Sequence, residues 1–79
     1  MITLEQMKKQ VEYAEVLEEL ATKFIETLDM EILGEYGEMY PSYRLHYLPD
    51  DFEPTENMKI ASKFYLVHKD KANKAYHGY

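Results

Sequence analysis

The side chains that could take part in chemistry in this chain of 79 residues are three histidines, two serines and many carboxylates. His46, His68 and His77 lie in separate segments, without the H-x-x-x-H spacing that puts two metal ligands on one helix face. Neither Ser42 nor Ser62 lies in a G-x-S-x-G turn, which exposes the nucleophile in many hydrolases. The absence of cysteine excludes thiolate metal sites and cysteine nucleophiles. The sequence therefore predicts no catalytic residue, no metal site and no cofactor.

Tyrosine is the unusual residue type, with eight copies against three phenylalanines and no tryptophan. A tyrosine ring offers rigid apolar area with a polar tip, which suits protein interfaces. Residues 32–53 contain more acids than their single arginine, which disfavours stacking on nucleic-acid bases because such stacking normally needs a basic groove. The alternative is a core role with the hydroxyls at its rim. The tyrosines predicted to anchor a protein partner are Tyr36, Tyr40, Tyr43 and Tyr47.

Charge is divided along the chain, whose formal net charge is −6. Residues 1–56 hold 14 acids and four bases, whereas residues 57–79 hold five lysines and one acid. On a helical wheel, five glutamates of residues 3–29 fall within an arc of about 120°. We interpret this arc as a stripe for a basic partner; the alternatives are a solvated outer face, or acids covered by the basic tail. The predicted acidic contacts are Glu12, Glu15, Glu19 and Glu26.

These acids require a helix, and residues 3–29 predict a long one. Apolar residues recur there at steps of three and four, Thr3 and Gln6 match a capping box, and Gly34 is the expected stop. About 26 residues span about 39 Å, whereas a compact chain of this length is about 30 Å across. The helix must therefore bend, break, project or be covered by a second copy. A heptad seam from Leu4 to Leu17 permits a short helical pairing, which Glu18 interrupts.

The remaining segments give mixed signals. Residues 43–48 alternate as a strand, with residues 35–40 as its partner across a turn at Pro41. A helix is expected at about residues 55–62. Residues 63–68 favour a third strand by propensity, although the apolar spacing from Ala61 to Ala75 also fits a helix. The expected fold is a single α+β domain over residues 1–79, in which a long N-terminal helix packs on a small antiparallel sheet. Residues 69–79 are expected to form a frayed basic tail. The alternative fold is an all-α helical hairpin.

No motif identifies a family, but the small, acidic, cysteine-free profile resembles accessory proteins of bacteriophages and mobile elements. Some anti-CRISPR and anti-restriction proteins of this kind present carboxylates where a nuclease expects DNA phosphates. The resemblance covers composition and layout, and it assigns no site residues. We therefore expect a non-catalytic protein-binding module in the cytoplasm of a bacterial host. Its expected target is a host protein with a basic surface, which it inhibits. If that target binds nucleic acid, the module would act as a DNA mimic.

Two other functions stay open. The first is a structural homo-oligomer, such as a homodimer, in which the long N-terminal helix buries its apolar edge against a second copy. The second is a DNA-binding regulator that uses the C-terminal lysines, although the net negative charge makes direct nucleic-acid binding unfavourable. No membrane association is expected, because no apolar run approaches the roughly 20 residues that a membrane span needs.

Overall fold

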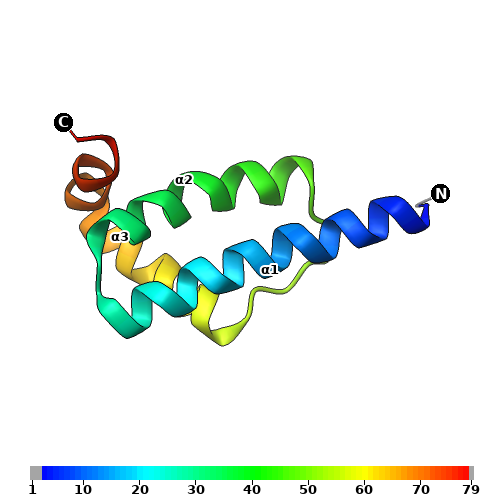
Figure 1. Ribbon diagram of the computed structural model, residues 1–79, viewed down its shortest axis with the longest axis horizontal. Coiled ribbons are helices and arrows are strands. Elements are labelled where there is room, and N and C mark those ends of the chain that lie inside the picture. The colour runs from blue at the N-terminus through cyan, green and yellow to red at the C-terminus, as the bar shows by residue number, and fades with distance from the viewer. Residues whose placement is uncertain (1–2, 79) are drawn as a thin grey trace.

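The computed structural model describes residues 3–78 and consists of three α-helices (Figure 1). Helix α1 is Leu4–Thr27, α2 is Met30–His46 and α3 is Glu56–His77. Helices α1 and α2 lie side by side and antiparallel, and α3 packs against both. Because no strand occurs among the described residues, the predicted α+β fold with a small sheet is wrong. The all-α alternative has the right class, but the chain forms three helices and not a hairpin of two.

Helix α1 begins as the sequence predicts. The backbone N–H of Gln6 donates to the Thr3 hydroxyl at 3.1 Å, and the N–H of Thr3 donates to the Gln6 side chain at 2.9 Å, which completes the capping box. The helix ends earlier than expected, at Leu28, which has φ 56° and donates its N–H to the carbonyl of Phe24. Asp29 then caps α2 by accepting from the N–H of Glu31 at 2.9 Å. The prediction that Gly34 stops the first helix is therefore wrong.

Helix α2 replaces the predicted hairpin, and close packing against α3 explains why this helix contains two glycines. Gly34 and Gly37 are buried where α2 meets α3. A methyl group on Gly34 would lie 2.3 Å from the carbonyl oxygen of Ala72, and one on Gly37 would lie 2.0 Å from the ring of Tyr65. The glycines therefore serve close helix packing and do not mark strand ends or turns. Pro41, the predicted turn residue, lies inside α2, although its missing N–H leaves one helical hydrogen bond unmade.

Helix α3 includes residues 63–68, so the predicted third strand is also wrong. Burial decides against β-propensity here, because a helix places Met58, Ala61 and Ala72 together in the core. The helical spacing that the sequence offered as the alternative is therefore the correct one. The backbone departs from helical angles at His68, with φ −112° and ψ 25°, so α3 is kinked there. Residues 69–77, for which a frayed tail was expected, are helical, while residue 79 of that tail lies outside the described residues.

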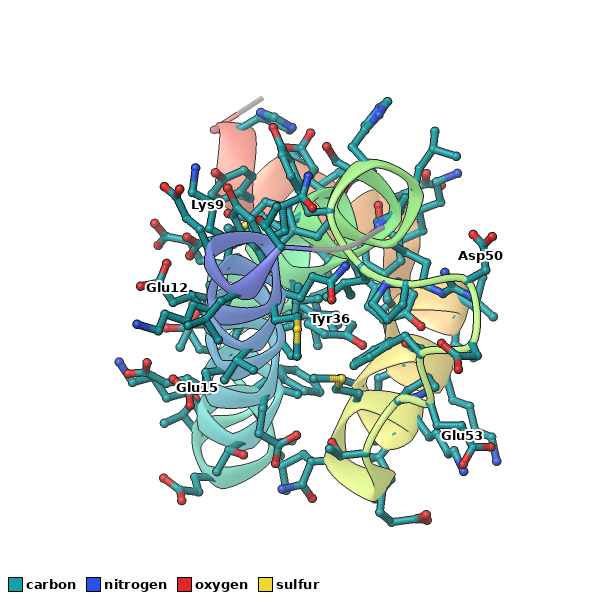
Figure 2. All side chains as sticks on the ribbon, turned by 90° about the vertical axis from the view of Figure 1, so that its right-hand side faces the viewer. Lys9, Glu12, Glu15, Tyr36, Asp50 and Glu53 are labelled. Atoms are coloured by element: carbon teal, nitrogen blue, oxygen red, sulfur yellow. The ribbon has the colours of Figure 1, made fainter. Side chains whose placement is uncertain are left out.

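Tyr36 occupies the centre of the core and points between the helices (Figure 2). Its hydroxyl donates to the carbonyl of Met58 at 3.0 Å and lies 2.9 Å from the Ser62 hydroxyl. Burial raises the pKa of Tyr36 to about 12, against the opposing effect of the Ser62 hydrogen bond. The other buried apolar residues around it come from all three helices and the loop before α3: Leu17, Ala21, Phe24, Leu33, Leu48, Met58, Ala61 and Ala72.

The first turns of α1 project past the end of α2, which is one of the four outcomes that the mismatch between helix length and domain size allowed (Figure 1). Its 24 residues are about 36 Å long, and the molecule measures 41 × 24 × 16 Å along its principal axes. The projecting part leaves apolar side chains exposed at Leu4, Met7 and Val11. Further along α1, Glu18 accepts a hydrogen bond from Thr55 and another, at 3.3 Å, from Asn57, which ties the helix to the start of α3.

Candidate protein-docking face

Three tyrosines, from α1, α2 and the residue that follows α2, form a compact cluster on the side of the molecule where α1 and α2 meet. Tyr13 of α1 stacks on Tyr47 with ring centroids 4.4 Å apart, and it meets Tyr43 edge-on at 4.7 Å. Tyr43 and Tyr47 contact each other edge-on at 5.7 Å. Tyr13 and Tyr43 are half-buried, whereas Tyr47, just after the end of α2, is 46% exposed. The three rings are therefore held by mutual packing and still present aromatic surface to solvent.

Three of the predicted acidic residues lie beside this cluster. Glu12, Glu15 and Glu19, together with Val16, Tyr13 and Tyr43, line a shallow depression of about 330 Å³. Glu12 and Glu15 point away from the helix bundle, on the side of α1 remote from α3 (Figure 2). We call the set Glu12, Tyr13, Glu15, Glu19, Tyr43 and Tyr47 the acidic tyrosine face.

The carboxylates of this face are exposed and have little internal compensation, whereas its aromatic end borders Lys9 and His46, which line a separate depression with Tyr13 and Tyr47. Lys23 pairs with Glu19 at 3.3 Å, and both side chains are exposed, so the pair is weak. Within the described residues, Glu12 and Glu15 have no ion-pair partner within 4.0 Å. Two full negative charges thus stand at the edge of an aromatic depression, where an arginine or lysine of another molecule can meet carboxylate and ring together.

The other predicted contact residues lie elsewhere. Tyr36 is buried in the core and has almost no surface to offer a partner. Tyr40 is half-buried against Tyr36 and lines a separate depression with Arg44 and Asp50. Glu26 is exposed two turns beyond Glu19 and does not line the acidic tyrosine face. The structure therefore brings together Glu12, Glu15 and Glu19 with Tyr43 and Tyr47, and it separates these five from Tyr36, Tyr40 and Glu26.

In the part of the chain that the structure describes, the acids of the loop before α3 and the lysines of α3 make no ion pair with the carboxylates of this face. Asp50 and Glu53 point out on the opposite side of the molecule from Glu12 and Glu15 (Figure 2). The five lysines of α3 are exposed, and no carboxylate among the described residues lies within ion-pair distance of them. The basic segment does approach one acid at its end, where His77 lies 2.5 Å from a carboxylate oxygen of Glu38 in α2. Glu12 and Glu15 of α1 are therefore open to an external partner.

Tyr13 is the residue of this face that the sequence reasoning missed. It lies at the centre of the cluster, in contact with both Tyr43 and Tyr47. Its neighbour Glu12 was singled out on the helical wheel, and the same wheel places Tyr13 between that acidic arc and the buried apolar stripe. Because a tyrosine has an apolar ring and a polar hydroxyl, its place at this boundary could have predicted that Tyr13 is partly buried and partly exposed.

Comparisons with protein-family models, with curated proteins and with solved structures find no match. Among residues 3–78, no group of three or more histidine and acidic side chains converges in a way that would hold a metal ion. No helix in the same part of the chain is both long and apolar enough to span a membrane.

Proposed function

We propose that this protein is a non-catalytic binding module that docks on a basic protein surface through its acidic tyrosine face. The observation that carries the proposal is the junction of three packed tyrosine rings, from α1, α2 and the residue after α2, with three exposed carboxylates of α1. The concrete form is an inhibitor of a nucleic-acid-binding protein, in which Glu12, Glu15 and Glu19 occupy cationic sites that would otherwise meet phosphates.

The two kinds of side chain have different roles in such docking. Tyrosines lose little conformational entropy on binding, and Tyr13 and Tyr43 are already held in place by their contacts with each other and with Tyr47. They supply the buried area that fixes affinity. Glu12 and Glu15 act at longer range, because their field attracts a basic partner and raises the association rate at low salt. The shallow depression between them suits a flat guanidinium group more than a small-molecule ligand.

The test is a pull-down from a bacterial lysate with the tagged protein, followed by washes of rising salt concentration and identification of bound proteins. The triple variant E12K/E15K/E19K should lose a stoichiometric partner that the parent protein captures and that high salt releases. The matched control is D50K/D51K/E53K, which changes net charge by the same amount and includes Asp50 and Glu53 on the opposite side of the molecule (Figure 2). Equal loss of the partner with both variants would show that net charge, and not this face, drives binding.

A second variant separates the aromatic contribution from charge. Tyr47→Ala removes the most exposed ring of the cluster without altering the net charge. We expect it to raise the dissociation rate of the identified partner and to leave the association rate within about twofold of the parent, because steering depends on charge. A partner that binds Y47A as tightly as the parent protein would exclude the tyrosine cluster from the interface.

A further inference from the structure

The projecting part of α1 exposes a second surface, which borders the acidic tyrosine face at Glu15 and Glu19. Leu4, Met7 and Val11 are 68%, 50% and 56% exposed, and they follow one another at steps of three and four residues. With Ala14 they occupy the a, d, a and d positions of a heptad pattern; we call these four residues the N-terminal seam. Apolar residues at such spacing on a helix normally lie against another helix, yet within residues 3–78 no other helix covers this one.

The N-terminal seam continues into an apolar depression of the domain body. The depression has a volume of about 430 Å³ and is lined by Val11, Ala14, Phe52, Met58 and the acids beside them. Ala14 has the smallest side chain of the seam, so its end of the seam has room for a larger apolar residue. The whole strip therefore combines a row of protruding side chains at one end with a hollow at the other.

We infer that the occupant of this strip is the N-terminal seam of a second copy of the chain, in antiparallel orientation. In that arrangement Leu4 of each copy enters the hollow beside Ala14 of the other, and Met7 of each lies against Val11 of the other. The protruding end of each copy thus enters the hollow of the other copy, and the two equivalent contacts satisfy twofold symmetry. This inference does not depend on the proposed docking function.

Charge complementarity selects the antiparallel orientation. Lys8 and Glu15 directly follow Met7 and Ala14 in the sequence and occupy the e positions that flank the seam. An antiparallel pair brings e positions of the two helices together, so Lys8 of each copy meets Glu15 of the other. A parallel pair would instead place Glu15 beside the neutral Gln10, with no opposite charge. Lys8 has no ion-pair partner within the described part of the chain, so it is available for this contact.

The contact is short, since 11 residues of helix extend about 16 Å, so the dimer should form reversibly as concentration rises. Sedimentation equilibrium of the full chain from micromolar to millimolar concentration should show monomers converting to dimers. Val11→Glu should abolish the dimer. Leu66→Glu is the matched control, because Leu66 is 77% exposed on α3 and lies outside the seam, so this variant should dimerise like the parent. Circular dichroism checks that both variants keep their helix content. A parent protein that stays monomeric, or a V11E variant that still dimerises, overturns the inference.

A charge exchange tests the orientation. Lys8→Glu places one glutamate opposite one Glu15 at each of the two symmetric contacts of the interface and should weaken the dimer about tenfold. The double variant K8E/E15K restores both pairs with reversed polarity, so its dimerisation constant should return to within about twofold of the parent value. A double variant that dimerises no better than K8E would refute the antiparallel register. K8E keeps every residue of the acidic tyrosine face, so its binding of the docking partner can be scored separately from dimerisation, whereas K8E/E15K alters Glu15 of that face and is scored for dimerisation only.

Discussion

Replacing Gly34 by alanine sets two physical effects against each other, and the structure decides which one wins. In an exposed helix interior, alanine is more favourable than glycine by about 1 kcal/mol, so α2 considered alone should gain stability. The added methyl group would, however, lie 2.3 Å from the carbonyl oxygen of Ala72 and 2.7 Å from Cβ of Tyr76. Ordinary contact begins at 3.4 Å, so α2 and α3 would have to separate by about 1 Å.

That separation is costly because the obstacle is the backbone of α3. Inserting a methyl group into a tightly packed contact costs typically about 1–3 kcal/mol, and a backbone obstacle places Gly34→Ala at the upper end. After the helix-propensity gain, the free energy of unfolding should fall by about 2 kcal/mol. For a domain of this size the melting temperature then falls by roughly 8–16 °C.

The assay is thermal and urea unfolding followed by circular dichroism, with Gly37→Ala as the comparison. The methyl group on Gly37 meets the Tyr65 ring, a side chain that can turn aside by giving up its 2.9 Å hydrogen bond to Asn73. We therefore expect G37A to cost less than G34A. A G34A variant that is more stable than the parent protein would refute the close approach of α2 and α3 at this residue.

Three further predictions concern stability. Because burial raises the pKa of Tyr36 from 10.0 to about 12, the folded state holds this proton while the unfolded state loses it, so the free energy of unfolding should fall by about 2 kcal/mol as pH rises from 10 to 12; Tyr36→Phe should lack that part of the decline in alkaline urea titrations. Pro41→Ala should raise the melting temperature, since it restores a helical N–H and removes a penalty of up to about 3 kcal/mol. Thr3→Ala should cost about 1 kcal/mol through loss of the capping box with Gln6, measured by urea denaturation, and an unchanged midpoint would contradict the observed cap.

Local sequence rules are sufficient for α1 and insufficient for α2. Residues 3–29 contain a capping box and no glycine or proline, so every local preference agrees with the helix that forms. In α2, Gly34 and Pro41 have local preferences that oppose the helix. The role of Gly34 depends on the carbonyl of Ala72, which is 38 residues away in the chain, and no local rule can anticipate such a contact. In α3 the aromatic and β-branched residues favour a strand until burial of Met58 and Ala72 is counted.

The candidate site follows the same division. The arc that contains Glu12, Glu15 and Glu19 could be read from the helical wheel, because it depends on α1 alone. The meeting of Tyr13 with Tyr43 could not, because it requires α1 and α2 to lie antiparallel at a particular register. Tyr36 was misplaced for the same reason, since only the packing of α3 onto α2 encloses its side chain.

The acidic tyrosine face and the N-terminal seam both lie on α1, so dimerisation through the seam would affect how the face binds its partner. An antiparallel dimer engages the N-terminal seam and Glu15, which also belongs to the acidic tyrosine face, but it leaves the tyrosine end of that face uncovered, because on a helical wheel Tyr13 lies on the opposite side of α1 from Val11. Each dimer would then present two docking faces, and a multivalent basic partner would be held with avidity. Val11→Glu should therefore weaken capture of such a partner on a dense surface and leave one-to-one binding in dilute solution unchanged. If V11E weakened both equally, the seam would belong to the docking surface itself, and the separation of the two surfaces would be incorrect.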